Sequence, residues 1–261
     1  MNLDLSNRNA LVCGSSQGIG KATAIALAKM GANVTLMARN EERLQVVLSE
    51  LDGSQGQSHN YVCANFSNIE TVKSAAKSIT VDKNIHILIN NTGGPASGSI
   101  TDASIDAFES AFQMHVACNQ ILAQAVTPGM KSDGFGRIVN IISTSVKIPI
   151  AGLGVSNTIR GAVASWAKTM SNELGRFGIT VNNILPGFTD TNRLKSLITK
   201  KAENQGVSEE QIANNMKAQI PVARFAQAEE VANATAFLCS PAAAYINGIN
   251  VPVDGGRTGS L

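Results

Sequence analysis

The segment Cys13-Gly14-Ser15-Ser16-Gln17-Gly18-Ile19-Gly20 joins the first apolar run of the chain, Asn9–Cys13, to an Ala-rich pattern over residues 19–30. The apolar run predicts a buried strand, and the Ala-rich pattern predicts a helix that Gly31 would end. A trio of glycines alone would also fit an ordinary turn. Here it stands between a strand and a helix, and this context predicts a turn that binds the phosphates of a dinucleotide.

The three glycines of this turn have separate expected roles. Gly14 would permit the tight exit from the strand, Gly18 would let the backbone approach a pyrophosphate, and Gly20 would let the helix pack close to the sheet. Free N–H groups and the positive end of the helix would then hold the phosphates. The remaining residues expected to contact the cofactor in this turn are Ser16, Gln17 and Ile19.

Short apolar runs alternate with helical patterns along the rest of the chain. Further strands are expected over residues 33–38, 59–64, 85–89, 137–142, 180–185 and 246–253. Further helices are expected over residues 41–51, 69–79, 106–130, 155–176 and 229–239. This alternation predicts βαβ units, and strands that are apolar at nearly every position predict a sheet covered on both faces. We therefore expect an α/β doubly wound Rossmann fold: one domain with seven mostly parallel strands and ligands at their carboxyl edge.

Composition excludes several classes of protein. The chain has 261 residues, 44% of them hydrophobic and 15% charged, with a formal net charge of +2. This balance gives no reason to expect nucleic acid or an anionic membrane as the main partner. No apolar stretch is long enough for a membrane-spanning helix, and the N-terminus lacks the pattern of a secretory signal. The four cysteines form no CxxC pair and are typical of reduced thiols in a cytoplasmic protein, and the histidine spacing makes a His-based metal site improbable.

The spacing G-x-x-x-G-I-G is similar to that of the short-chain dehydrogenase/reductase family, and later segments extend the resemblance over about residues 7–256. Asn90-Asn91-Thr92-Gly93 resembles the NNAG motif of that family, and the segment 136–143 (GRIVNIIS) resembles its fifth strand and active-site serine. Pro186-Gly187 followed by Thr191 resembles the motif beside the nicotinamide, and Val253-Asp254-Gly255-Gly256 resembles the C-terminal signature. The closest general resemblance is to 3-oxoacyl-carrier-protein reductases. It implies hydride transfer between a nicotinamide and a carbonyl or alcohol. The cofactor contacts that it implies in these segments are Asn91, Gly93, Pro186, Gly187, Thr189 and Thr191.

The end of the second expected strand bears on the choice of cofactor. A cofactor with two free ribose hydroxyls is usually held by a carboxylate at this point, where the chain has Ala38 followed by Arg39. A guanidinium can grip a 2′-phosphate, so we expect NADP(H) to be preferred over NAD(H), although Arg39 would also fit a solvated loop. Asn65 stands where relatives usually place Asp near the adenine, and its amide could both accept and donate there.

The resemblance fails at the group that should move the proton. In the family a Tyr donates or accepts it, a Lys four residues later lowers the pKa of the Tyr and holds the ribose, and a Ser and an Asn assist. Ser143 fits the Ser, but the Tyr position is Ser156, the Lys position is Arg160 and the Asn position is His115. No Tyr-x-x-x-Lys occurs anywhere in the chain.

These replacements have chemical consequences. A serine hydroxyl is a far weaker acid than a phenol, whose unperturbed pKa is ~10. Arg160 could still bind the ribose and keep positive charge near the reaction centre, but it would not release a proton. An imidazole with an ordinary pKa of ~6.5 could supply the proton through a Ser143–Ser156–water–His115 relay. The alternatives remain open: His115 bound to a neighbouring carbonyl, Ser156 filling space, and Arg160 in a salt bridge or interface.

A polar helical segment over residues 191–221 is expected to cover the substrate, as a lid does in the family. Its basic residues are Arg193, Lys195, Lys200 and Lys201. They could meet an acidic carrier such as coenzyme A or an acyl carrier protein, or they could form a solvated helix face. The two long helices contain many small residues, and relatives pair such helices into tetramers, so a homotetramer or homodimer is expected.

Two functions therefore compete. One is an NADP(H)-dependent oxidoreductase acting on a small carbonyl or alcohol, which could resemble a 3-oxoacyl thioester, with a modified path for the proton. The other is an NADP(H)-binding pseudoenzyme that serves as a sensor or regulatory subunit. The absent Tyr and Lys favour the second, whereas Ser143 and the complete lid favour the first. Hydrolysis through Ser143 lacks a Ser–His–acid arrangement in the sequence.

Overall fold

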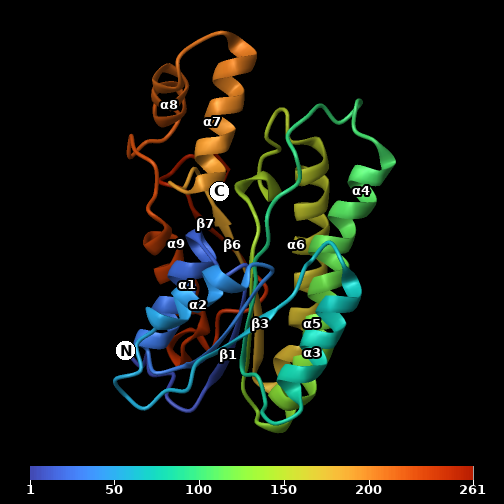
Figure 1. The fold of residues 1–261 in the computed structure, drawn as a ribbon, viewed down its shortest axis with the longest axis vertical. Coiled ribbons are helices and arrows are strands. Elements are labelled where there is room, and N and C mark those ends of the chain that lie inside the picture. The colour runs from blue at the N-terminus through green and yellow to red at the C-terminus, as the bar shows by residue number, and fades with distance from the viewer. Residues whose placement is uncertain (261) are drawn as a thin grey trace.

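A seven-stranded sheet, parallel throughout, forms the centre of the computed structural model, which describes residues 1–260 (Figure 1). The strand order is β3-β2-β1-β4-β5-β6-β7, so the chain reverses direction across the sheet between β1 and β4. The strands are β1 (Asn9–Cys13), β2 (Asn33–Ala38), β3 (Asn60–Cys63), β4 (Ile87–Asn90), β5 (Gly136–Ile141), β6 (Ile179–Pro186) and β7 (Asn250–Val253). The predicted doubly wound sheet of seven strands is confirmed, and the reversal places a ligand site at the carboxyl ends of β1 and β4.

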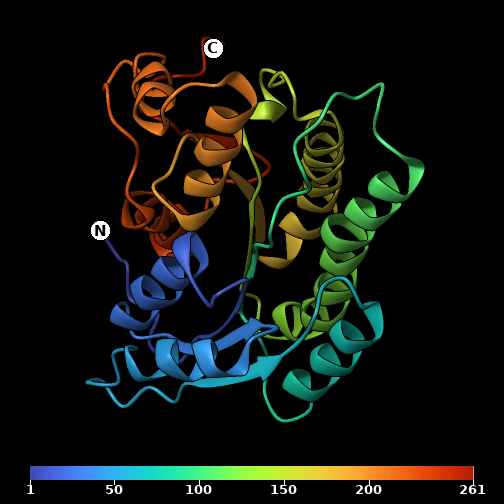
Figure 2. The ribbon, with the colours of Figure 1, turned by 45° about the horizontal axis from the view of Figure 1, so that its top comes forward.

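Helices cover both faces of this sheet, as Figure 2 shows. The first face carries α1 (Gly18–Lys29), α2 (Glu41–Ser49) and α9 (Ala228–Cys239). The second face carries α3 (Ile69–Thr80), α5 (Cys118–Ser132) and α6 (Gly154–Leu174). Side chains alternate between the two cores along each strand, so Val12 packs under α1 while its neighbour Leu11 packs under α3 and α5. Both are fully buried, and burial on both faces explains why the strands are apolar at successive positions.

The long helix that was predicted over residues 106–130 is interrupted. The chain forms α4 (Ile105–Phe112), then a π-helical turn over Gln113–Ala117, and then α5. No proline or glycine marks the turn, so the apolar pattern gave no sign of it. A π-turn adds one residue to the helix and changes the direction in which later side chains point. It contains His115, one of the predicted site residues.

The last strand is also shorter than predicted. β7 begins at Asn250, whereas residues 246–249 form a turn in which Gly248 has a φ of 72°. At the end of α6, a short 3-10 turn over Gly175–Phe177 replaces the final residues of the predicted helix. These differences concern element ends and leave the strand order unchanged.

Two helices stand beyond the carboxyl ends of the strands, at the upper end of the molecule in Figure 1. They are α7 (Asn192–Gln205) and α8 (Glu209–Lys217), and they follow β6 along the chain. They share a small core of their own, formed by Leu194, Ile198, Ala202, Ile212 and Met216. This pair occupies the place that the sequence assigned to a lid.

A chain of asparagine amides crosses four strands at the edge of the sheet. Asn90 Nδ2 donates to Asn140 Oδ1, Asn140 Nδ2 donates to Asn183 Oδ1, and Asn183 Nδ2 donates to Asn250 Oδ1, each over 2.8 Å. These residues are also direct partners in the registers of β4, β5, β6 and β7. Within residues 1–260, Asn90 Oδ1 is buried and accepts no hydrogen bond.

Two other features of the described chain narrow the search for a site. No helix within residues 1–260 has the length and apolar character needed to cross a membrane. The same residues contain no group of three or more His, Cys, Asp or Glu side chains that could hold a metal ion.

Candidate active site

The glycine turn after β1 is shaped by backbone geometry. Gly14 and Gly18 have φ values of 59° and 55°, a left-handed conformation that side chains with a Cβ rarely adopt. A Cβ on Gly14 would lie 2.6 Å from the carbonyl oxygen of Asn91, and one on Gly18 would lie 3.3 Å from Cγ2 of Thr191. Asn91 Nδ2 in turn donates to the carbonyl oxygens of Cys13 and Gly14, which ties this turn to β4.

The N-terminus of α1 is open to an anion. No side chain caps its first turn, and no acidic residue lies there. In five other helices, among them α2 and α7, the N-cap side chain accepts a hydrogen bond from the first turn, whereas the first N–H groups of α1 have no such partner. Free N–H groups together with the helix dipole are a suitable site for a phosphate. The residues of this turn therefore fit the pyrophosphate of a dinucleotide.

A cavity of about 550 Å³ begins at this turn and runs to the first turns of α6. Most of the predicted site residues line it: Gly14, Gln17, Gly18, Ile19, Asn91, Gly93, Ser143, Ser156, Arg160, Pro186, Gly187, Thr189 and Thr191. Ser16 and Gly20 belong to the turn but do not line the cavity. Gly20 lies beneath it, where a Cβ would collide with the carbonyl group of Gly14.

Arg39 and Asn65 lie outside the cavity, at the ends of two neighbouring strands. Ala38 and Cys63 are register partners at the ends of β2 and β3, which places Arg39 and Asn65 on adjacent loops. Arg39 is exposed and takes part in none of the ion pairs found within residues 1–260. The Asn65 Oδ1 atom accepts a hydrogen bond of 3.1 Å from the backbone of Ser67, so its amide shapes its own loop.

Hydrogen bonds from the start of α7 hold the lid against both sides of the cavity. Asn192 Nδ2, at the start of α7, donates to Gln17 Oε1 in the glycine turn over 3.3 Å. Arg193 Nη2 donates to the carbonyl oxygen of Pro95, in the loop after β4, over 2.7 Å. Thr191 caps α7 and also faces Gly18. These contacts place the positive charge of Arg193 in the cavity wall.

Ser143, Ser156 and Arg160 face the cavity at its far end from the glycine turn. Ser143 Oγ accepts a hydrogen bond of 3.1 Å from the backbone of Ser145, which holds the hydroxyl group in place. Ser156 lies in the first turn of α6 and Arg160 lies one turn later. This end of the cavity offers two hydroxyl groups and a guanidinium to a bound substrate.

Arg160 is a buried cation without a carboxylate. Its Nη1 donates to the carbonyl oxygen of Ile141 over 3.2 Å, and it forms no ion pair within residues 1–260. Burial, together with the nearby charge of Arg193, lowers the pKa of Arg160 to about 10. A charge held in this way favours an anion or a developing negative charge beside it. The predicted alternative of a salt bridge is not found in the described chain.

His115 is buried behind the cavity and does not line it. Burial lowers the pKa of His115 to about 3, the charge of Arg160 adds to this effect, and the hydrogen bond with the Gly93 backbone opposes it. Within residues 1–260 its Nε2 atom has no hydrogen-bond partner. The low pKa favours the neutral imidazole at physiological pH, which weakens the case for the Ser143–Ser156–water–His115 relay, and the relay stays a prediction.

Neither tyrosine of the chain replaces the absent phenol. The Tyr61 hydroxyl donates to a carboxylate oxygen of Glu41 over 2.8 Å on the surface near β3, and Tyr245 is fully exposed. Neither residue lines the cavity. The site therefore lacks a phenol in space as well as in sequence.

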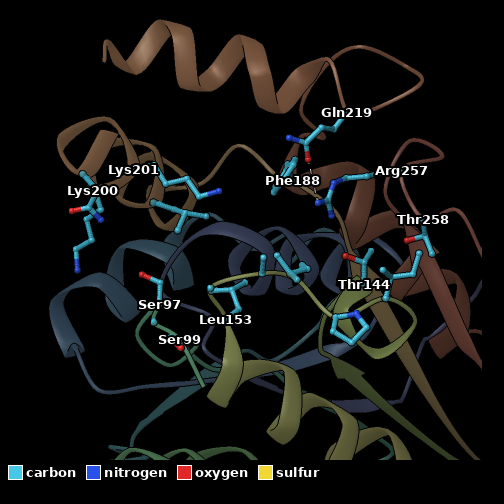
Figure 3. A pocket seen from close by; sticks show the side chains of 18 residues that line it. Ser97, Ser99, Thr144, Leu153, Phe188, Lys200, Lys201, Gln219, Arg257 and Thr258 are labelled. Atoms are coloured by element: carbon cyan, nitrogen blue, oxygen red, sulfur yellow. Dashed lines mark hydrogen bonds between the residues drawn. The ribbon is translucent and has the colours of Figure 1, made fainter. Parts of the chain in front are cut away.

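A second cavity of about 610 Å³ adjoins the first beneath the lid (Figure 3). Residues that line both cavities are Thr144, Ile150, Leu153, Phe188, Leu197 and Arg257. Arg257 was not among the predicted site residues, although it directly follows the C-terminal signature that ends at Gly256. The second cavity has mixed polar and apolar walls, which suits a small organic molecule.

The chain is similar to known proteins over nearly its whole length. It matches the family described as Enoyl-(Acyl carrier protein) reductase over residues 14–258. It is 32% identical to the 3-oxoacyl-(acyl-carrier-protein) reductase FabG of Vibrio cholerae over 97% of this chain and 98% of that protein. It is 31% identical to the 7alpha-hydroxysteroid dehydrogenase of Escherichia coli K12, over 100% of this chain and 98% of that protein.

Solved structures show the same fold. The L-sorbose reductase from Gluconobacter frateurii, in complex with NADPH and L-sorbose, superposes with a TM-score of 0.93 at 29% identity, over 100% of both chains. A 3-oxoacyl carrier protein, a hydroxysteroid and L-sorbose thus appear in the names of similar proteins. The likeness therefore indicates a common reaction and leaves the substrate to the side chains of each pocket.

Proposed function

The chain belongs to the short-chain dehydrogenase/reductase family, whose members are NAD(P)-dependent oxidoreductases, and from this premise we propose that it reduces a carbonyl group with NADPH. One observation carries the proposal: the open N-terminus of α1 and the groups of Ser143, Ser156 and Arg160 line one continuous cavity. A dinucleotide with its phosphates at Gly18 would place its other end beside these groups. When bound, the reduced cofactor supplies a hydride.

The preference for NADP(H) rests on the end of β2. Arg39 is exposed there and has no acidic partner within residues 1–260, and no carboxylate stands at Ala38 to accept ribose hydroxyls. Arg43 lies nearby and donates to Gln17 Oε1 over 3.2 Å, which adds a second positive charge beside the turn. A 2′-phosphate would pair with these guanidinium groups.

The chain's own residues supply the rest of the reaction. Hydride addition to the carbonyl carbon moves an electron pair onto the carbonyl oxygen, which then takes a proton to give the alcohol. The hydroxyl groups of Ser143 and Ser156 donate hydrogen bonds to this oxygen, and the charge of Arg160 stabilises it as negative charge develops. A water molecule that enters the open cavity gives the proton, and the hydroxide that forms leaves to bulk solvent, where buffer neutralises it. His115, with its low pKa, takes no part in this step as a charged group.

The experiment that tests the proposal has two stages. Titration of the protein with NADPH and NADH, followed by cofactor fluorescence, is expected to show tighter binding of NADPH. Replacing Arg39 with Asp is expected to weaken NADPH binding by about 10–100-fold, since a charge-assisted pair is lost, while NADH binding serves as the internal control.

The second stage follows NADPH oxidation against ketones, thioesters and oxo acids. If NADPH oxidation occurs and Ser143→Ala strongly reduces its rate, the result supports an enzyme. Tight NADPH binding without oxidation by any carbonyl compound would contradict hydride transfer and favour the pseudoenzyme.

A further inference from the structure

Among the charged side chains that line the two cavities, nearly all are positive. The cationic residues that line them are Arg160, Arg193, Lys195, Lys200, Lys201 and Arg257. Asp190 is the acidic residue among those that line either cavity, and it lies 3.8 Å from Lys195. Since the whole chain has a formal net charge of only +2, positive charge is concentrated at this site. A cavity with one sign of charge attracts ligands of the opposite sign.

The cofactor explains only part of this charge. The inner cavity, with a volume of about 550 Å³, contains the glycine turn, so the phosphates of a dinucleotide would offset positive charge beside that turn and not the charge of Arg160 at the other end. The second cavity, of about 610 Å³, is the outer one, and none of the turn residues Gly14, Gln17, Gly18 and Ile19 lines it. No acidic side chain within residues 1–260 lines the outer cavity, so an anionic substrate that enters there would meet its cations without a competing carboxylate in the wall.

Arg257 is the cation best placed to bind such an anion. Its guanidinium carbon lies 4.2 Å from the ring centre of Phe188, and Nη2 donates to Gln219 Oε1 over 3.4 Å, which fix the plane of the group (Figure 3). Its Nε is buried and has no hydrogen-bond partner within residues 1–260, where it also forms no ion pair. A buried donor without an acceptor costs about 1–3 kcal/mol, which a ligand acceptor would recover.

The other outer cations are less suited to this role. Lys200 is exposed and Lys201 half-buried, and Figure 3 shows both on the side of the pocket away from Arg257. Exposed ammonium groups hold their charge in water and gain little from one partner. A planar guanidinium matches the two oxygens of a carboxylate. Arg257 also lines the inner cavity, so one molecule can reach it and the two serines together.

We propose that the substrate is a compact organic acid with an oxo group, and that Arg257 binds its carboxylate while its carbonyl oxygen faces Ser143 and Ser156. The inference rests on the proposed hydride transfer and names the substrate class of that same site. It assigns specificity to Arg257, a residue outside the cofactor turn and outside the groups that face the reacting oxygen. Thioesters of bulky carriers would place their phosphates at the rim, near Lys200 and Lys201.

The test compares acids with their neutral esters. NADPH oxidation is measured with 2-oxohexanoate, 5-oxohexanoate and their ethyl esters, using the full chain and the Arg257→Gln variant. At least one acid is expected to have a kcat/KM about 10–100-fold above that of its ester. Arg257→Gln is expected to remove this difference by raising KM for the acid and to leave the ester unchanged. Arg176→Gln is the matched control, since Arg176 also stacks on a ring, that of Phe177, outside both cavities.

Equilibrium binding separates this inference from the proposed function. Calorimetric titration of the NADP⁺-saturated protein with the same acids and esters requires no turnover. Acid binding that depends on Arg257, without any turnover, supports the carboxylate site and contradicts hydride transfer. Equal binding of acid and ester, or an equal effect of Arg257→Gln on both, overturns the inference. So does turnover of acetoacetyl-CoA that Lys200→Gln with Lys201→Gln abolishes and Arg257→Gln leaves unchanged.

Discussion

The two ends of the inner cavity are built from different materials. At the end beside α1, the walls are backbone: two left-handed glycines, free N–H groups and the loop after β4. At the end beside α6, the walls are side chains, namely Ser143, Ser156 and Arg160. The first end could change only if the turn itself changed. The second end can change its chemistry through single substitutions while the fold stays the same.

This contrast explains how the turn can keep its shape while the side chains at the other end of the cavity vary. The position of the turn follows from the strand and helix that flank it, and Asn91 fixes it further through the carbonyls of Cys13 and Gly14. The side chains of Ser156 and Arg160 contribute less to the fold. Within residues 1–260 the Ser156 side chain forms no hydrogen bond, and the Arg160 side chain forms one, to the carbonyl oxygen of Ile141. Binding and reaction chemistry can therefore vary separately in this molecule.

The most complete loss is expected from a Cβ in the backbone end, because it removes cofactor binding itself. Gly18→Val would force a β-branched residue into a left-handed conformation and fill the space that a phosphate needs, beside Thr191. NADPH affinity is expected to fall by about 100-fold or more, measured by fluorescence titration. Gly134→Val is the control, since Gly134 has a φ of 61° but no atom within 4 Å of its added Cβ. Equal loss of NADPH affinity in both variants would contradict the role assigned to the glycine turn at the backbone end of the cavity.

The second effect concerns the side-chain end. If that end varies independently, Ser156→Tyr with Arg160→Lys supplies the pair typical of the family without disturbing the turn. Reduction of ethyl 2-oxohexanoate by NADPH is expected to rise by about 10²–10⁴-fold, the usual contribution of a positioned general acid. Ser165→Tyr, at an exposed position of the same helix, is the control. A double variant that binds NADPH normally and gains no rate would show that more than these two side chains separates the site from its relatives.

The smallest effect is expected on the pH dependence of stability, which depends on how deeply His115 is buried. Its pKa of about 3 in the folded state lies below the ordinary value of 6.5, so the unfolded chain binds a proton that the folded chain does not. Stability from the neutral imidazole is therefore complete above about pH 6.5 and is lost as the pH falls toward 3. The slope is at most about 1.4 kcal/mol per pH unit.

Urea unfolding of the wild type and of His115→Asn across this range is the measurement. The difference in unfolding free energy between the two proteins is expected to shift in favour of the variant as the pH falls. The pH–rate profile of the variant is expected to keep its shape between about pH 5 and 8, because a neutral imidazole does not titrate there. A parallel pair of stability curves would mean that His115 is solvated in the folded state.

The sequence was sufficient where a local signal was strong. Asn9–Cys13 and Asn33–Ala38 are strands with the predicted bounds, since buried parallel strands read as continuous apolar runs between turns. Most residues of the predicted site line one cavity because their motifs follow the ends of adjacent strands. The π-turn at Gln113–Ala117 had no such signal, because its residues suit an ordinary helix.

The properties of two residues depended on contacts that are distant in sequence. The low pKa of His115 comes first from its burial and then from the charge of Arg160, which lies far from it in the sequence. Arg257 became a site residue only when the C-terminal segment was seen beside Phe188 and Gln219. Spacing along a chain does not reveal such neighbours, whereas the fold does.

The asparagine chain across the sheet fixes the relative positions of residues that line the cavity above it. Each of its first three members, Asn90, Asn140 and Asn183, is followed three positions later by a residue that lines the cavity: Gly93, Ser143 and Pro186. A shift of one strand by a single residue would break the amide chain and move its loop relative to the others. These three cavity residues therefore follow the amide chain at the same interval along the sequence. The relative positions of Gly93, Ser143 and Pro186 in the cavity wall therefore depend on buried amides that do not line the cavity.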